Sequence, residues 1–242
     1  DLMACTAKQS YVGEFVRVHA SAVHPVRDVN PKRASLTYPL SVALDLVEAS
    51  DIRLDQQLVV YGTDPVALLS VYLARRRGAR QIIVIAKSRN KKGIELAKTF
   101  GADEFMLSDR EHPTVKVMTL AGKRGADRVL IAAPPGVIPQ AIGISRFGGI
   151  VIYSGIRFGE GGEWPVTFDA NKFLFNRLQL RGVYPVPNLR FPLALKLLAS
   201  APAFIDEINT HEFPLDKTMD ALTMLAEENE AVERVVIKIA DA

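Results

Sequence analysis

Short apolar runs alternate with helical stretches through the middle of the chain. Six runs rich in Val, Ile, Leu, Phe or Tyr predict buried strands, at residues 58–61, 82–85, 104–107, 128–132, 150–154 and 178–184. Helical spacing of apolar residues, or helix start and stop signals, predicts helices at 65–77, 93–100, 113–120 and 137–145. This regular alternation predicts an α/β fold built on a doubly wound parallel sheet.

The flanks of this region have weaker patterns. Residues 12–20 alternate apolar and polar side chains, which is typical of a half-buried strand. The remaining predictions are a polar loop at 24–33, helices at 40–47, 191–200 and 215–228, an irregular segment at 158–176, and a closing strand at 235–239. No internal repeat and no low-complexity segment interrupts the chain.

The turn after the first of the six strands has one glycine of a nucleotide-binding fingerprint. Dinucleotide-binding folds have G-x-G-x-x-G here, where the second glycine admits a pyrophosphate to the backbone N–H groups of the helix that follows. This chain reads Gly-Thr-Asp-Pro-Val-Ala over residues 62–67, so Asp64 replaces the second glycine. Asp64 before Pro65 is also a strong helix start, with Asp as N-cap. The turn alone leaves a phosphate site and a self-capped structural turn as equal alternatives.

The turn after the second strand is basic. A cofactor with a free ribose 2′-hydroxyl usually meets an acidic residue there, whereas a 2′-phosphate favours a small hydroxyl residue and an Arg. Residues 87–92 read Lys-Ser-Arg-Asn-Lys-Lys, and residues 65–94 contain eight Lys or Arg and no Asp or Glu. A solvated charge run is the simpler interpretation of these residues. Their position after a second strand favours the phosphate site, and therefore NADP over NAD.

Composition is ordinary for a globular protein. The 242 residues are 48% hydrophobic and 24% charged, and the net charge of +3 argues against a protein built to bind nucleic acid. The single cysteine, Cys5, excludes an internal disulfide and favours a reducing compartment, so a cytoplasmic location is expected. No apolar run is long enough to span a membrane, and no signal peptide is visible. Because the chain begins at Asp1, we expect a fragment or a processed product.

The candidate metal ligands are scattered. They are Cys5, His19, His24, His112 and His211. Catalytic zinc needs three close N, S or O ligands, and no pair among these residues has the short spacing of a metal motif. We expect no metal site in this chain, a structural role for His211, and a free thiol at Cys5.

Five segments, in order, resemble the zinc-type medium-chain alcohol dehydrogenase family, the group that includes sorbitol and threonine dehydrogenases. They are VGEFVRV at 12–18, YPLSVAL at 38–44, ELAKTFGAD at 95–103, FGGIVIYSGI at 147–156 and INTHEFPLDKTMDAL at 208–222. The resemblance implies a Rossmann dinucleotide-binding domain at 39–186. It also implies remnants of a GroES-like catalytic domain at both ends, at 1–38 and at 187–242, where the C-terminal segment packs back on the first remnant.

The chain departs from the family in its zinc chemistry. The N-terminal lobe with its catalytic Cys and Gly-His-Glu ligands is absent, as is the four-cysteine structural zinc loop. The family's Glu-Pro-Leu segment has Tyr38 in place of its acidic residue. Asp64 and Ala67 replace two fingerprint glycines. We therefore expect that this chain alone is not catalytically competent.

The resemblance assigns roles to particular residues. Along the pyrophosphate it places Gly62, Thr63, Pro65 and Val66; at the 2′-phosphate Ser88, Arg89 and Lys92; and at the nicotinamide end Ala133, Pro134, Gly155 and Ile156. Tyr38 is the one candidate for a catalytic proton donor, and simple packing is its alternative role.

The sequence leaves three functions open. The first is an oxidoreductase that transfers hydride between NADP(H) and an alcohol or carbonyl compound, seen here without its zinc site. The second is a non-catalytic relative that binds NADPH or acts by protein interaction. The third is another nucleotide-binding domain such as a methyltransferase, which the acid-free turn at Ser88 and Arg89 disfavours. The resemblance also implies a homodimer formed through the sheet-edge strand at 178–184.

Overall fold

The computed structural model describes residues 3–5, 12–155, 164–184, 186–227 and 231–239. The chain divides into two compact units. One consists of residues 1–42 and 186–242, and the other of residues 43–185. No helix among the described residues has both the length and the apolar character needed to cross a membrane.

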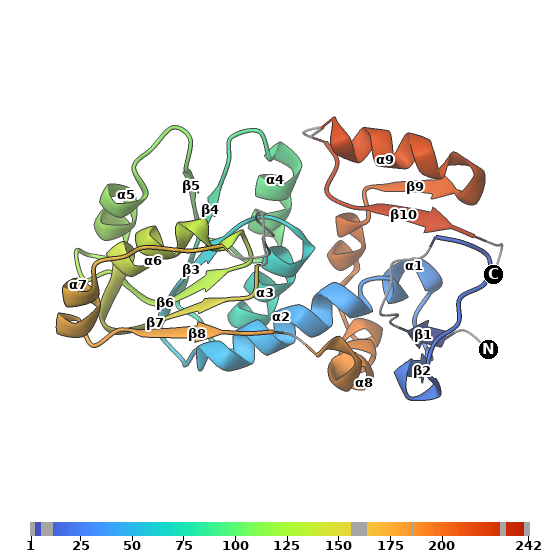
Figure 1. The fold of residues 1–242 in the computed structure, drawn as a ribbon, viewed down its shortest axis with the longest axis horizontal. Helices are drawn as coiled ribbons and strands as arrows, with labels where there is room; N and C mark the ends of the chain where they lie inside the picture. Colours follow the sequence, from blue (N-terminus) through green and yellow to red (C-terminus); the bar gives the residue numbers. More distant parts are fainter. Residues whose placement is uncertain (1–2, 6–11, 156–163, 185, 228–230, 240–242) are drawn as a thin grey trace. The chain divides into compact units, whose positions relative to one another are not determined.

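The unit of residues 43–185 is built on a six-stranded sheet in which every neighbouring pair is parallel (Figure 1). The strands are β3 (Gln57–Tyr61), β4 (Gln81–Ala86), β5 (Glu104–Leu107), β6 (Ala126–Ile131), β7 (Ser145–Tyr153) and β8 (Gln179–Gly182). Their order is β5-β4-β3-β6-β7-β8, so the chain moves outward from β3 in one direction and then in the other. This confirms the predicted doubly wound sheet.

Helices cover both faces of this sheet. They are α3 (Pro65–Arg76), α4 (Lys91–Thr99), α5 (Pro113–Leu120), α6 (Ile138–Ile144) and α7 (Ala170–Phe175), with α2 (Thr37–Ser50) leading in and the 3₁₀ turn η2 (Pro135–Val137) before α6. Alternate strand residues such as Val59 and Val129 share a core cluster with Val117 of α5 and Ala141 of α6. The crossovers through α3 and α4 run toward the opposite sheet edge from the crossover through α6. Right-handed connections therefore place α3 and α4 on one face of the sheet and α6 on the opposite face.

Most predicted boundaries in this unit agree with the structure to within a few residues, and three differ. β7 begins at Ser145, five residues before the predicted start, although its first residues are mostly exposed and its main pairing with β6 starts at Ile150. β8 is shorter than predicted and ends at Gly182. The segment predicted to be irregular contains α7, whose N-cap Asp169 accepts a hydrogen bond from the Lys172 N–H at 3.0 Å.

The second unit joins the two ends of the chain. Its elements are β1 (Met3–Cys5), η1 (Ala20–Ala22), β2 (Val23–Pro25), α1 (Pro31–Ala34), α8 (Pro187–Ala199), η4 (Ala203–Ile208), β9 (His211–Pro214), η5 (Leu215–Lys217), α9 (Thr218–Ala226) and β10 (Val235–Lys238). β1 and β2 pair antiparallel, β9 and β10 pair parallel, and α9 packs on the latter pair. Helix α9 and strand β10 agree with the helix and closing strand predicted there.

A polar network holds residues near α1 to the C-terminal segment of this unit. The Arg33 guanidinium donates to both carboxylate oxygens of Asp206, at 2.7 and 2.5 Å. Arg234 donates to the Ser35 hydroxyl at 2.7 Å and to the Asn209 side-chain oxygen at 2.6 Å. The Arg33–Asp206 and Arg234–Ser35 contacts join residues that are 173 and 199 positions apart in sequence.

The strand predicted at 12–20 is wrong. The structure has no strand there, and the Phe15 side chain is 92% exposed. The predicted loop at 24–33 instead begins inside β2 and ends inside α1. Alternation marks a strand only when one face of it is buried and its backbone has a hydrogen-bonding partner, and residues 12–20 have neither in the described part of this unit.

Candidate functional site

In the turn between β3 and α3, the side chain of Asp64 occupies the N-terminus of the helix that follows. Gly62 has φ +111°, a conformation that favours glycine. Asp64 is the N-cap of α3, and its carboxylate accepts a hydrogen bond from the Ala67 N–H at 2.8 Å. Pro65, at the first helical position, has no N–H to offer. The predicted helix start is confirmed, and the carboxylate already uses a donor that a phosphate at this helix end would need.

The basic turn after β4 contacts the first turn. The Asn90 side chain donates to the Thr63 hydroxyl at 3.2 Å. Thr63 is only 2% exposed, so its hydroxyl belongs to the framework of the site. Lys92 pairs with Glu95, one turn further along α4, at 3.3 Å. The Asn90–Thr63 hydrogen bond thus holds the two turns side by side at the carboxyl ends of β3 and β4.

An acidic residue that the sequence pattern missed lies beside this basic turn. Asp109 follows β5, and its carboxylate accepts from the Ser88 backbone N–H at 2.9 Å and from the Ser88 hydroxyl at 2.5 Å. Hydrogen bonding from the Ser88 side chain, with the backbone bond second, lowers the pKa of Asp109 below its usual value. Residues 65–94 contain no acid, yet the fold brings one to Ser88 from a different strand.

A cavity of about 390 Å³ lies at the carboxyl ends of β3, β4, β5 and β6. It is lined by Tyr61, Gly62, Ile85, Ala86, Lys87, Arg89, Asn90, Ser108, Ala133, Pro134, Gly136, Val137, Gln140 and Trp164. Four of the residues predicted to bind the cofactor therefore line one cavity: Gly62, Arg89, Ala133 and Pro134. Of the other predicted residues, Thr63 and Ser88 belong to the two turns beside it. Pro65 and Val66 begin α3, Lys92 lies in the first turn of α4, and Ile156 lies outside the described residues.

Tyr61, which ends β3 and lines this cavity, has a buried hydroxyl group. The residue is 3% exposed, and its hydroxyl has no hydrogen-bond partner among the described residues. Burial raises the pKa of Tyr61, so the hydroxyl keeps its proton at neutral pH. A buried hydroxyl without a partner costs free energy, and Tyr61 belongs to the hydrophobic core cluster of this unit.

The ends of β6 and β7 approach each other closely through Gly155. A Cβ atom at this position would lie 2.0 Å from the Ala133 carbonyl oxygen and 2.7 Å from its carbonyl carbon. Only glycine permits this approach, because the opposing atoms are backbone and cannot rotate away. Gly155 thus fixes the backbone at Ala133, which lines the cavity.

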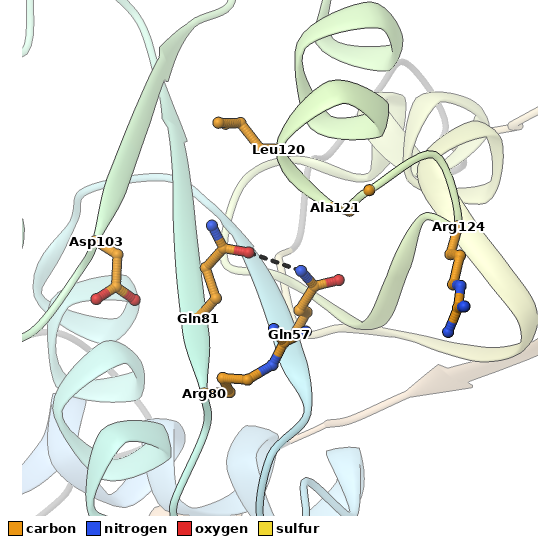
Figure 2. A pocket seen from close by; sticks show the side chains of 8 residues that line it. Gln57, Arg80, Gln81, Asp103, Leu120, Ala121 and Arg124 are labelled. Carbon is orange, nitrogen blue, oxygen red and sulfur yellow. Dashed lines mark hydrogen bonds between the residues drawn. The ribbon is translucent and has the colours of Figure 1, made fainter.

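A larger cavity, of about 680 Å³, lies near the opposite ends of the strands and is the weaker candidate (Figure 2). Gln57 and Gln81 begin β3 and β4, and their side chains bond to each other at 2.7 Å. Asp103 in its wall is bonded to the Ile82 N–H at 2.7 Å and pairs with Arg75. These groups are engaged in the framework, and open α/β sheets bind ligands at the carboxyl ends of their strands.

Tyr38, the candidate proton donor, belongs to the unit of residues 1–42 and 186–242. Its side chain is 53% exposed. With Met3, Cys5 and Phe191 it lines a cavity of about 280 Å³ in that unit. The residues around its side chain in this cavity are apolar or small.

The described residues do not fit a zinc site. Nowhere in the described part of the chain do three His, Cys, Asp or Glu side chains come together as metal ligands would. His24 is bonded to the Asn188 side chain at 2.6 Å, His19 to the Ser21 hydroxyl at 2.7 Å, and His211 to the Thr210 hydroxyl at 3.0 Å.

Solved structures share this fold. An alcohol dehydrogenase from Thermus sp. ATN1 superposes with a TM-score of 0.81 at 23% identity, over 90% of this chain and 61% of that one. A short chain alcohol dehydrogenase from E. coli CFT073, complexed with the cofactor NADH, gives a TM-score of 0.80 at 17% identity, over 92% of this chain and 64% of that one. At these identities the likeness shows the fold alone.

Sequence comparison shows the family. Residues 65–200 match the family model described as zinc-binding dehydrogenase. The L-threonine 3-dehydrogenase of Bacillus subtilis is 30% identical over 209 residues, which are 84% of this chain and 58% of that protein. The sorbitol dehydrogenase of Gallus gallus is 28% identical over 193 residues, 78% of this chain and 52% of that protein. The chain thus spans about half the length of the curated relatives it matches, and it belongs to the zinc-binding, medium-chain alcohol dehydrogenase family.

Proposed function

We propose that the chain is the dinucleotide-binding part of an oxidoreductase that transfers hydride between a nicotinamide cofactor and an alcohol or carbonyl compound. The observation that carries the proposal is the cavity at the carboxyl ends of β3, β4, β5 and β6, beside a glycine turn with φ +111°. The names of the matched relatives, sorbitol dehydrogenase and L-threonine 3-dehydrogenase, support the reaction type. The fold neighbour complexed with NADH supports the cofactor type.

The residues around the cavity would bind and orient the cofactor. Gly62, Thr63, Pro65 and Val66 would follow the pyrophosphate, Ser88, Arg89 and Lys92 the adenosine ribose, and Ala133, Pro134, Gly155 and Ile156 the nicotinamide end. The cofactor, when bound, supplies the ring carbon that gives or takes the hydride. Tyr38 lines a cavity of the other unit among apolar and small residues, so we propose a packing role for it.

We further propose NADP(H) as the preferred cofactor. The β4–α4 turn carries Lys87, Arg89, Lys91 and Lys92, and Lys87 and Arg89 line the cavity. An Arg and a Lys at the ribose attract a 2′-phosphate more than a 2′-hydroxyl.

Titration with NADPH and, in parallel, with NADH tests cofactor binding. Trp164 is the only tryptophan in the sequence and lines the cavity, so its fluorescence reports on occupancy. A ligand at roughly 100 times its Kd should raise the free energy of unfolding by about 2.7 kcal/mol, which a thermal shift detects. Stronger effects with NADPH than with NADH are expected. No response to either cofactor would overturn the proposed function.

The substitution Asp64→Asn is expected to tighten binding of both cofactors about tenfold, since it removes a negative charge beside the pyrophosphate position and keeps an N-cap side chain. Fluorescence titration measures the change. Asp169→Asn is the matched control, because Asp169 caps α7 in the same way but lies outside the turn between β3 and α3 that would hold the pyrophosphate. Equal affinities in wild type and Asp64→Asn would show that no phosphate approaches this turn.

We also propose a cytoplasmic homodimer. β8 is the outer strand of the sheet, so one edge of its backbone has no strand partner in the described residues of this unit. Leu174, Phe175 and Tyr184, just before and after it, are 68%, 73% and 82% exposed. Light scattering coupled to size-exclusion chromatography measures the mass in solution, and a monomer at micromolar concentration would contradict the proposed dimer.

A further inference from the structure

The pairing of β4 with β5 determines which residue meets Ser88. The two strands run parallel, with Ala86 opposite Leu107. Two residues further along each chain, the same register places Ser88 opposite Asp109. Both Ser88 donors, the backbone N–H and the hydroxyl, are bonded to the Asp109 carboxylate, at 2.9 and 2.5 Å. Neither donor is directed to the cavity while these bonds persist.

A 2′-phosphate bound by Ser88 would lie close to a like charge. A phosphate oxygen at about 2.7 Å from the Ser88 hydroxyl can be no more than roughly 5 Å from the carboxylate oxygen that the hydroxyl now contacts. The pKa of Asp109 is lowered by hydrogen bonds from Ser88, so the carboxylate is charged at neutral pH. The adjacent Arg110 also favours the charged form. A ribose 2′-hydroxyl has no charge and could donate a hydrogen bond to such a carboxylate.

We propose that Asp109 is a specificity-determining residue of the cofactor site. Its carboxylate occupies the Ser88 hydrogen-bond donors that a 2′-phosphate would need, and this limits the preference for NADP(H) over NAD(H). This inference rests on the proposed function and deepens it. The basic residues of the turn attract the 2′-phosphate, and Asp109 opposes them from the next strand. The balance between the two sets the ratio of the two affinities.

A purely structural role is the alternative. In that case Asp109 ties the end of β4 to the loop after β5, and its replacement weakens the fold without changing the ratio of affinities. The ratio of Kd values separates the two roles, since a loss of folded protein weakens binding of both cofactors equally.

The test compares Asp109→Asn with wild type in titrations with NADPH and NADH at low salt. The ratio Kd(NADH)/Kd(NADPH) is expected to rise about fivefold or more, because a charge is removed and the Ser88 hydroxyl is released. The rise should diminish in added salt, as expected for an exposed carboxylate. In the double variant Asp109→Asn with Ser88→Ala, the ratio Kd(NADH)/Kd(NADPH) should fall below that of Asp109→Asn, because the released hydroxyl is no longer present.

The matched control is Glu111→Gln. Glu111 is an acid in the same loop, but its carboxylate bonds to the Leu107 N–H at 3.2 Å and to Lys116 at 3.0 Å, not to Ser88. Its replacement should leave the ratio unchanged. An unchanged ratio in Asp109→Asn, or an equal rise in both variants, would overturn the assignment of Asp109.

Two smaller probes distinguish failure here from failure of the proposed function. Adenosine 2′,5′-bisphosphate and AMP differ only in the 2′-phosphate and have no pyrophosphate to meet Asp64. If the larger cofactors do not bind but the bisphosphate gains on AMP in Asp109→Asn, the role of Asp109 holds and the proposed dinucleotide site is wrong. If both probes bind with the same ratio in wild type and variant, Asp109 has no role in selection. If no probe binds any variant, both proposals are wrong.

Discussion

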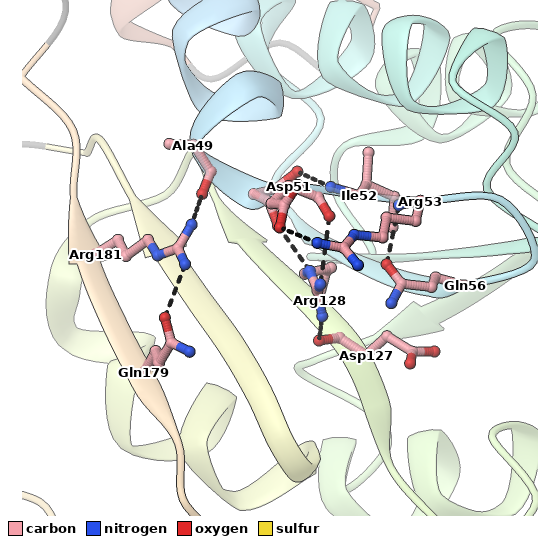
Figure 3. A network of polar contacts seen from close by, with 10 residues as sticks. Ala49, Asp51, Ile52, Arg53, Gln56, Asp127, Arg128, Gln179 and Arg181 are labelled. Atoms are coloured by element: carbon pink, nitrogen blue, oxygen red, sulfur yellow. Dashed lines mark hydrogen bonds and ion pairs between the residues drawn. The ribbon is translucent and has the colours of Figure 1, made fainter.

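Replacement of Arg128 by methionine is expected to lower the free energy of unfolding by about 3 kcal/mol, since buried charge-assisted hydrogen bonds are lost and their acceptors stay buried. Arg128 lies on β6 and is 6% exposed. Its guanidinium donates to the carbonyl oxygens of Ser50 at 2.6 Å, Asp51 at 3.3 Å and Asp127 at 2.9 Å (Figure 3). α2 ends at Ser50, so the arginine caps the helix terminus.

The expected loss of stability has its physical reason in the unpaired carbonyl groups at the C-terminus of a helix. The last carbonyl groups of a helix have no partner inside the helix, and a cation there also interacts favourably with the helix dipole. Burial lowers the pKa of Arg128, although not enough to remove its charge at neutral pH. Methionine fills a similar volume with an apolar chain, which leaves the Ser50 carbonyl inside the protein without this donor.

Urea unfolding and a thermal scan measure the effect, and a decrease of roughly 6–12 °C in the melting temperature is expected for a chain of this size. The control is Arg181→Met. Arg181, on β8, donates to one carbonyl of the same helix end, that of Ala49, at 2.7 Å (Figure 3), and it is more exposed. A loss of about 1 kcal/mol is expected there. Equal losses in the two variants would show that burial of the guanidinium is not the decisive factor.

The parallel sheet could be predicted from sequence because each of its parts is a local pattern. Strands buried on both faces are continuous apolar runs, as in residues 58–61 and 82–85, and glycines and helix caps separate them. Asp64 and Pro65 predicted the start of α3 to the residue, since an N-cap depends only on the next turn of chain.

The smaller unit could not be predicted in the same way. β1 and β2 have three residues each, and β9 has four, too few to establish any periodicity. Their existence depends on partners elsewhere in the chain, such as β10 for β9. Residues 12–20 show the converse, because their alternation is clear but they have no strand partner among the described residues of this unit.

Asp109 shows why the site was only partly predictable. It is 21 positions from Ser88, and no local motif links the two residues. The contact follows from the parallel register of β4 and β5, in which Ala86 lies opposite Leu107. Such a pair can be predicted when the register of two parallel strands is extended beyond their ends. The sequence of the turn alone shows only basic residues around Ser88.

The substitution Gly155→Ala is expected to lower the free energy of unfolding by about 2–3 kcal/mol and to weaken cofactor binding, since the added methyl group overpacks two backbones. Its Cβ would lie 2.0 Å from the Ala133 carbonyl oxygen, so the ends of β6 and β7 would have to separate. Because Ala133 lines the cavity, that movement would change the shape of the site.

Gly136→Ala is the control within the same cavity wall. Gly136 lines the cavity, and a Cβ atom there would meet nothing within 4 Å, so stability should change by less than about 0.5 kcal/mol. Urea unfolding gives the stabilities and Trp164 fluorescence the cofactor affinities. Wild-type stability in Gly155→Ala would mean that β7 shifts at no cost, and the close approach would then not define the cavity. Lost stability with unchanged affinity would instead separate the strand contact from the cofactor site, and would place the nicotinamide away from the ends of β6 and β7.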